Sequence, residues 1–250
     1  MDANQLQETF DSDGYVQMRS LFSADEIAET REHLARFIRE VVPTMPKEHV
    51  FYEDKVDSST LKQMQNMHEL DEYFGALING KAKELAEIVL KGPALPENLQ
   101  YFNKCAGIGQ PTPAHQDGYY FMLDPCEAVT MWLALEEVDD ENGCVHYARG
   151  SHLGGMLEHG RTTTLGFSQG LAEPDQFVGS PEDEAMHAQP GDLLAHHALT
   201  VHWASGNNSP TRSRQALGLV YFSANAKEDI AARDAYRAKL AEDMAKAGKI

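Results

Sequence analysis

The chain has 250 residues, of which 42% are hydrophobic, and these values predict one compact domain. Acidic residues outnumber basic ones by 39 to 21, which gives a formal net charge of -18. An acidic surface repels phosphate backbones and anionic lipids, so we expect neither nucleic acid nor a membrane as a partner. The sequence contains no membrane-spanning apolar run and no signal-peptide pattern at its start.

The cysteines indicate the compartment. Cys105, Cys126 and Cys144 cannot all form pairs, and none belongs to a C-x-x-C motif. Free thiols are typical of a reducing environment, so we expect a cytoplasmic protein. The sequence gives no indication of an oligomeric state.

Residues 1–98 are expected to form a mainly helical part. Ser23, followed three residues later by Glu26, is typical of a helix N-cap with a capping box. Apolar residues then recur at helical spacing over residues 27–38, and a second helical pattern covers residues 70–90. The Pro- and Gly-containing residues 92–98 are expected to close this part.

From residue 99 the pattern changes to short strands separated by turns. Alternating apolar side chains predict a strand over residues 128–138, followed by a turn at 139–143. Residues 191–205 and 215–224 also read as strands, and residues 226–247 as a C-terminal helix. The acidic segment 171–184 is either a solvated loop or a flap over an active site. The predicted fold class is therefore mainly β with flanking helices, a jelly roll with its core over residues 99–225.

Histidines and one aspartate predict a metal site in the β part. If His115 begins a strand, His115 and Asp117 point to the same face, because side chains alternate with period two. A distant third ligand would complete a facial triad that leaves positions open for other ligands. The candidates His196, His197 and His202 lie in one strand-like stretch, and His196 and His202 have the same parity.

His202 is the preferred third ligand because the segment after it leads directly to a strand that carries Arg214. A guanidinium near the metal could hold the far carboxylate of a chelating dicarboxylate with two parallel hydrogen bonds. His196 and His197 then take packing roles or support the ligands. An H-x-D pair alone is weak evidence, since it is also common in ordinary turns.

Several segments together resemble the phytanoyl-CoA dioxygenase family. LQYFNK (99–104), HQDGYYF (115–121), residues 131–152, residues 191–208 and RQAL (214–217) occur in the order of that family. The resemblance implies a cupin-like double-stranded β-helix that binds Fe(II) and uses 2-oxoglutarate and O2 as co-substrates. It also assigns roles to particular positions. The implied metal ligands are His115, Asp117 and His202, and the implied 2-oxoglutarate-binding residues are Arg214, Trp132, Gln100 and Lys62.

The implied reaction is hydroxylation of an unactivated C–H bond, with succinate and CO2 as co-products. An acidic chain without a basic patch suits a small-molecule substrate, a metabolite or natural product, better than a CoA thioester. Candidate substrate-binding residues are Tyr119, Tyr120, Phe121, His146 and Arg149. Two alternatives stay open, namely a cupin-like metalloenzyme that does not use 2-oxoglutarate and a non-catalytic ligand-binding member of the fold.

Overall fold

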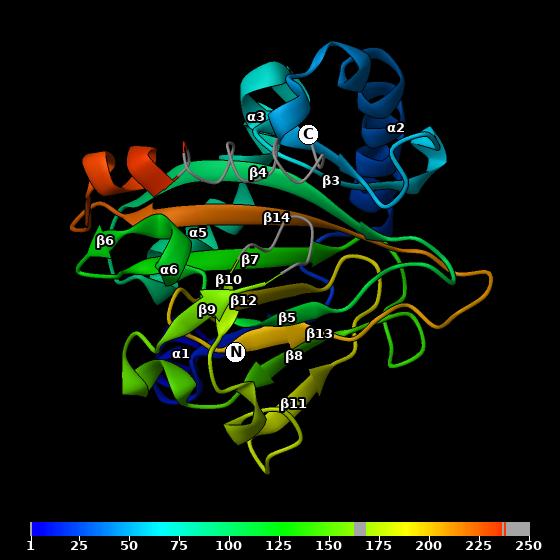
Figure 1. The fold of residues 1–250 in the computed structure, drawn as a ribbon. Coiled ribbons are helices and arrows are strands. Elements are labelled where there is room, and N and C mark those ends of the chain that lie inside the picture. The colour runs from blue at the N-terminus through cyan, green and yellow to red at the C-terminus, as the bar shows by residue number, and fades with distance from the viewer. Residues whose placement is uncertain (1, 163–168, 237, 239–250) are drawn as a thin grey trace.

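Two antiparallel sheets face each other in the computed structural model, which describes residues 2–162, 169–236 and 238 (Figure 1). The larger sheet has, in spatial order, β1 (Tyr15–Met18), β12 (Leu193–His197), β7 (Ala128–Ala134), β14 (Arg214–Ser223), β4 (Ala94–Lys104), β3 (Leu61–Met64) and β2 (Val50–Tyr52). The smaller sheet has β11 (Asp183–Met186), β8 (Val145–Ala148), β13 (His202–Ala204) and β5 (Thr112–His115). This arrangement is a double-stranded β-helix that is not closed into a barrel, and it confirms the predicted fold class.

Two further ribbons lie beside these sheets. They pair β9 (His159–Arg161) with β10 (Gln169–Leu171), and β6 (Leu123–Asp124) with β15 (Lys227–Glu228). Short 3-10 turns occupy several connections, at Val42–Thr44, Lys47–His49, Ser58–Thr60, Ser151–Gly154 and Pro174–Gln176. The last of these lies in the acidic segment predicted as a loop or flap.

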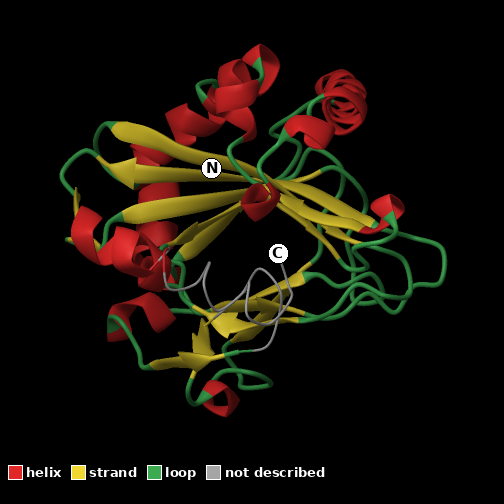
Figure 2. Ribbon diagram, turned by 45° about the horizontal axis from the view of Figure 1, so that its top comes forward, coloured by secondary structure: helices red, strands yellow, loops and turns green. Residues whose placement is uncertain are grey.

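Helices flank the larger sheet (Figure 2). They are α1 (Ala3–Asp13), α2 (Ala24–Glu40), α3 (Met67–Leu70), α4 (Glu72–Ile78) and α5 (Lys81–Val89), and a short α6 (Gly118–Phe121) follows β5. The predicted capping box begins α2: Ser23 Oγ accepts from the Glu26 amide at 3.3 Å, and the Glu26 carboxylate accepts from the Ser23 amide at 2.7 Å. These bonds satisfy N–H groups that have no partner inside the helix.

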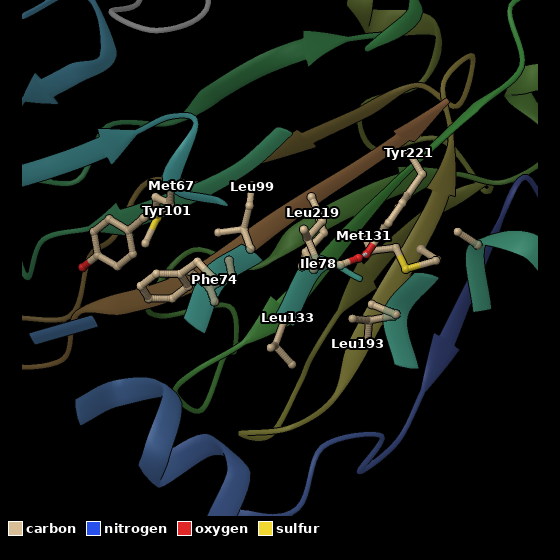
Figure 3. Close-up of a cluster of buried hydrophobic side chains, with 14 of the residues drawn as sticks. Met67, Phe74, Ile78, Leu99, Tyr101, Met131, Leu133, Leu193, Leu219 and Tyr221 are labelled. Carbon is tan, nitrogen blue, oxygen red and sulfur yellow. Dashed lines mark hydrogen bonds between the residues drawn. The ribbon is translucent and has the colours of Figure 1, made fainter. Parts of the chain in front are cut away.

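The two faces of the larger sheet have different tasks. Met131 and Leu133 of β7 point toward the helices, where they join Leu219 and Tyr221 of β14 in the main apolar core (Figure 3). The alternate residue Trp132 faces the smaller sheet and belongs to a second cluster between the layers. One side of each central strand therefore anchors the fold, and the other side is available to line a site.

The elements differ from the expectations in several details. The first 98 residues contain more helix than strand, but they also contribute β1, β2, β3 and the start of β4 to the larger sheet. Residues 191–205 form two strands, β12 and β13, which belong to different sheets. Residues 230–236 are helical, whereas most of the remaining predicted C-terminal helix lies outside the described residues. Within the described part of the chain, no helix is long and apolar enough to cross a membrane.

Candidate active site

The structure brings His115, Asp117 and His202 together between the sheets. His115 ends β5 and His202 begins β13, and the two residues are direct partners in the ladder. Asp117 Oδ1 lies 3.5 Å from His115 Nε2 and 3.6 Å from His202 Nε2. One ligand atom from each residue lies within 4.8 Å of those of the other two. This spacing allows all three atoms to bind one ion.

The backbone at Asp117 does not continue the strand that was expected to include this residue. The strand stops at His115, and Asp117 has helical backbone angles (φ -60°, ψ -35°) directly before α6. The carboxylate therefore reaches the histidines from a turn, and the period-two argument for His115 and Asp117 was wrong. The amide of Gly118, the next residue, donates to the carbonyl of Ala198 at 2.8 Å, which fixes this turn.

Both histidines of the triad are oriented in the same way. His115 Nδ1 lies 2.8 Å from the carbonyl of Pro113, and His202 Nδ1 lies 3.0 Å from the carbonyl of Thr200. A carbonyl can only accept, so each Nδ1 carries its hydrogen and each Nε2 keeps its lone pair. These lone pairs belong to the two atoms nearest Asp117 Oδ1, as metal ligation requires.

Asp117 is held by its second oxygen. Oδ2 accepts from Thr130 Oγ1 at 2.6 Å and from His196 Nε2 at 3.2 Å, and Thr130 and His196 are partners in the β7–β12 ladder. His196 Nδ1 in turn lies 2.9 Å from the hydroxyl of Tyr147. These contacts leave Oδ1 directed at the histidines.

The charge states suit a divalent ion. Burial acts to raise the pKa of Asp117, but the histidines around its carboxylate, His202 first, outweigh burial and hold this pKa well below its usual value. Burial and the two neighbouring histidines lower the pKa of His202 well below its usual value. The triad thus offers a carboxylate oxygen and imidazole nitrogens in the forms that bind metal, and this donor set fits ferrous iron.

Arg214 and Trp132 lie together on the inner face of the larger sheet. The guanidinium carbon of Arg214 lies 5.1 Å from the Trp132 ring centre, and Arg214 Nε donates to the carbonyl of Gly143 at 3.1 Å. Arg214 is 4% exposed, and no carboxylate of the described residues forms an ion pair with it. Burial lowers its pKa to about 10, so it stays charged at neutral pH. A buried cation of this kind favours an anionic ligand.

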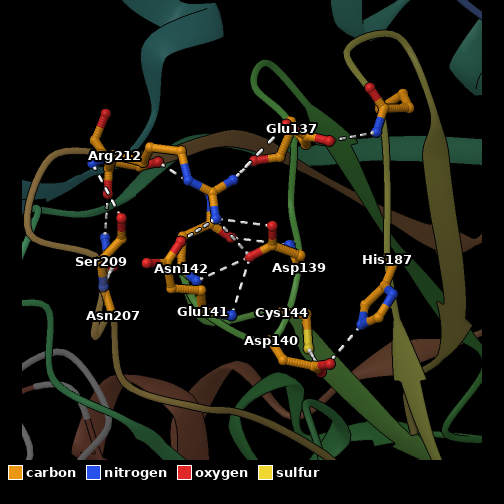
Figure 4. A network of polar contacts seen from close by, with 12 residues as sticks. Glu137, Asp139, Asp140, Glu141, Asn142, Cys144, His187, Asn207, Ser209 and Arg212 are labelled. Atoms are coloured by element: carbon orange, nitrogen blue, oxygen red, sulfur yellow. Dashed lines mark hydrogen bonds and ion pairs between the residues drawn. The ribbon is translucent and has the colours of Figure 1, made fainter.

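Arg212, two residues before Arg214, is occupied elsewhere. It forms ion pairs with Asp139 at 2.8 Å and with Glu141 and Glu137 outside the sheets (Figure 4). Its charge is therefore already balanced, and of the two arginines only Arg214 faces the space between the sheets.

Gln100 and Lys62 lie toward the edge of the larger sheet. Gln100 is the ladder partner of Gly218, which separates it from Trp132 on the next strand, and its Oε1 accepts from Gln63 Nε2 at 3.2 Å. Lys62 is buried and forms an ion pair with Glu53 at 3.3 Å. The structure therefore places Gln100 on the Trp132 face, whereas Lys62 already has a carboxylate partner.

The aromatic residues after Asp117 lie on both sides of α6. The ring centre of Tyr120 lies 6.1 Å from that of His115, and its hydroxyl bonds to the backbone of Gln169. Tyr119 stacks on His159, and Phe121 packs against Phe222. Of these three side chains, Tyr120 is the one with a ring contact to the triad.

Two substrate candidates point elsewhere. His146 and Trp203 are ladder partners whose rings stack, on the opposite face of β8 from Tyr147, which contacts His196. Arg149 is exposed and forms an ion pair with Glu184. Neither side chain is directed at the triad, and a substrate contact of His146 or Arg149 stays a prediction.

Three site residues escaped the sequence interpretation. Thr130 has the same parity as Trp132, so alternation along the strand could have placed it on the inner face. Lys104 is 5% exposed and is the ladder partner of Arg214. Burial, Arg214 and Lys62 lower the pKa of Lys104 well below its usual value. Tyr147 carries no sequence signal, because its partner His196 belongs to the other sheet.

Comparisons with known proteins agree with this geometry. A model of the family "Phytanoyl-CoA dioxygenase (PhyH)" matches residues 10–216. Phytanoyl-CoA dioxygenase 1 of rice is 28% identical, over 84% of this chain and 85% of that protein. A probable alpha-ketoglutarate-dependent hypophosphite dioxygenase of Stutzerimonas stutzeri is 26% identical, over 90% and 80% of the two chains.

Solved structures show the same fold. The epimerase SnoN, in complex with Fe3+, alpha ketoglutarate and nogalamycin RO, has a TM-score of 0.72 at 24% identity and covers 93% of this chain and 89% of its own. EctD from S. alaskensis, with 2-oxoglutarate and 5-hydroxyectoine, has a TM-score of 0.72 at 19% identity and covers 89% and 76% of the two chains. The chain belongs to the phytanoyl-CoA dioxygenase family of Fe(II)- and 2-oxoglutarate-dependent oxygenases.

Proposed function

We propose that this protein is an Fe(II)- and 2-oxoglutarate-dependent dioxygenase in which His115, Asp117 and His202 hold the metal and Arg214 anchors the co-substrate. The observation that carries the proposal is the pairing of two features that face the space between the sheets. One is a set of three ligand atoms with matched orientation, and the other is a buried guanidinium without a carboxylate partner among the described residues.

The chain's own residues prepare the metal site. Bound ferrous iron supplies the activation of O2 in the presence of 2-oxoglutarate. Pro113 and Thr200 hold the two imidazoles with Nε2 toward the site, so no reorientation of these rings is needed. Thr130 and His196 occupy Asp117 Oδ2, which favours ligation through Oδ1 alone and leaves other coordination positions to the co-substrates.

Arg214 is proposed to bind the distal carboxylate of 2-oxoglutarate, above the Trp132 ring. A carboxylate would supply the counter-charge that the described residues do not give this guanidinium. Lys104, directly opposite in the ladder, lies beside the same place. Gln100 and Lys62 would line the outer end of the space beside Arg214, and Trp132 and Leu194 would keep water from this space.

The substrate is proposed to be a small metabolite or natural product that is hydroxylated at an unactivated C–H bond. The names of similar proteins include hypophosphite, nogalamycin RO and 5-hydroxyectoine, which supports a small-molecule substrate. Tyr120, next to His115, is the proposed first contact with the substrate. The three cysteines are free thiols, which supports a reducing, cytoplasmic location.

Anaerobic titration with Fe(II) and 2-oxoglutarate tests the site. The wild type should develop a weak visible charge-transfer band. His202→Ala should abolish the band, and Arg214→Ala should shift it to higher 2-oxoglutarate concentration. His197→Gln is the matched control, because His197 lies on β12 with its ring against Phe10 and His152, and its band should be unchanged.

A metabolite screen that reads succinate release tests the reaction. Succinate formed together with a hydroxylated product supports the proposal. Turnover of a substrate without 2-oxoglutarate would favour a cupin-like enzyme, and a band of full strength in His202→Ala would remove His202 from the site.

A further inference from the structure

A second group of metal-ligating side chains lies where the turn after β7 meets the segment between β11 and β12. Asp140, Cys144 and His187 each offer one ligand atom, and these three atoms lie within 4.8 Å of one another. Asp140 lies between the other two residues (Figure 4), with Oδ1 3.5 Å from Cys144 Sγ and 3.0 Å from His187 Nε2. We propose that these three residues form a zinc site, separate from the iron triad, with solvent completing the coordination.

The distances match a zinc ion. Bonds of about 2.3 Å to sulfur and about 2.0–2.2 Å to nitrogen and oxygen place tetrahedral ligand atoms roughly 3.4–3.6 Å apart. Cys144 Sγ lies 3.5 Å from Asp140 Oδ1, which matches this spacing. The Asp140–His187 pair is closer, at 3.0 Å, and would have to separate by roughly half an ångström.

His146 lies beside the site. Its Nδ1 lies 2.7 Å from Asp183 Oδ1, and its ring stacks on Trp203 at an interplanar angle of 14°. Its Nε2 lies 3.6 Å from Cys144 Sγ.

Access and chemistry favour zinc over iron. The side chains of His187 and Asp140 are 51% and 74% exposed, so an ion can enter from solvent, whereas Cys144 is fully buried behind them. Thiolate selects zinc, and the iron triad has no sulfur. Burial and then Asp140 raise the pKa of the Cys144 thiol to about 12, so zinc binding releases this proton to solvent and strengthens as the pH rises.

The site would stabilise a functional turn. Cys144 follows Gly143, whose carbonyl accepts from Arg214 Nε. Ligands on residues 140, 144 and 187 would tie this turn to the segment before β12. The ion is therefore assigned a structural role, behind the proposed 2-oxoglutarate anchor.

Titration with Co(II), which replaces zinc in thiolate sites and gives a thiolate charge-transfer band, tests the assignment. The wild type should bind two ions per chain and show this band. Cys144→Ser should bind one ion and lose the band. His202→Ala should keep the band, which separates this site from the iron site.

Two other thiols provide controls. Cys126 lies near the triad, since burial and then Asp117 raise the pKa of its thiol. Cys105 lies near Asn103. Cys126→Ser and Cys105→Ser should both retain the band. His187→Ala changes an exposed side chain, tests the site without disturbing the core, and should weaken the thiolate-linked binding by about tenfold or more. A wild type without the band, a band that survives Cys144→Ser, or unchanged affinity in His187→Ala would overturn the proposal.

Discussion

The hydroxyl of Tyr147 lies 2.9 Å from Nδ1 of His196, and this contact joins the smaller sheet to the larger one directly behind the triad. His196 Nε2 faces a carboxylate oxygen that can only accept, so Nε2 carries the hydrogen and Nδ1 accepts from Tyr147. The hydroxyl therefore selects the tautomer of His196 that orients Asp117.

Tyr147→Phe should lower the Fe(II) affinity by about tenfold, because His196 loses the donor that fixes its tautomer. Equilibrium dialysis of Fe(II) under anaerobic conditions measures this. Tyr15→Phe is the control, since Tyr15 is the ladder partner of His196 and its ring stacks on Tyr147 at 4.8 Å, but the hydroxyl that contacts His196 Nδ1 belongs to Tyr147. An equal loss of Fe(II) affinity in both variants would show that packing, and not the hydrogen bond to His196, causes the effect.

Arg214→Met should abolish the stabilisation of the protein by 2-oxoglutarate. At a hundred times its Kd, a ligand that binds only the folded state stabilises it by about 2.7 kcal/mol. Thermal unfolding of the Fe(II)-loaded wild type should show this as a higher Tm. Without 2-oxoglutarate the variant should unfold at the same temperature as the wild type or higher, because it no longer buries an uncompensated charge. Arg212→Met, which alters only the outer ion pairs, should keep the response to 2-oxoglutarate.

His197 should make the protein less stable in mild acid. Its Nδ1 accepts from the Leu199 amide at 3.0 Å, and burial, followed by His152 and His196, lowers its pKa to about 4. Between the unfolded pKa of about 6.5 and this folded value, the unfolded chain binds the extra proton, so stability falls as the pH falls. The contribution is at most about 3 kcal/mol. Urea unfolding between pH 7 and 4 measures the slope, which should be smaller in His197→Gln.

Gly191 should tolerate no side chain. It has φ +93°, and an added Cβ would meet the carbonyl oxygen of Phe22 at 2.1 Å. Gly191→Ala should therefore cost more than about 2 kcal/mol in the free energy of unfolding, from backbone strain together with displacement of the Phe22 segment. Gly179 has φ +74° with open space around it, so Gly179→Ala should cost only about 1 kcal/mol. Equal losses in urea unfolding would show that the clash is relieved.

Features that depend on residues close in sequence could be predicted. The capping box at Ser23 lies within one helix, and the alternation of Met131 and Leu133 lies within one strand. Both predictions were confirmed. Edge strands such as β2 have only three or four residues, too few for a periodic pattern to show. The break between His197 and His202 contains neither Gly nor Pro, and only pairing with different distant strands separates β12 from β13.

The same holds for the candidate site. The order of motifs predicted the triad and Arg214. The side chains that orient Asp117 belong to Thr130 and His196, which are brought together only by the ladder between β7 and β12. Contacts that depend on the register of remote strands leave no pattern in a single sequence.

The division of labour between the layers has a practical consequence. The triad belongs to β5, β13 and the turn before α6, whereas the groups that orient Asp117 stand on β7 and β12 of the opposite layer. A copy whose layers failed to join would lack a properly oriented carboxylate and would release its ferrous ion. Misassembled chains would thus hold no ferrous ion that activates O2, and oxidation outside the assembled site would be avoided.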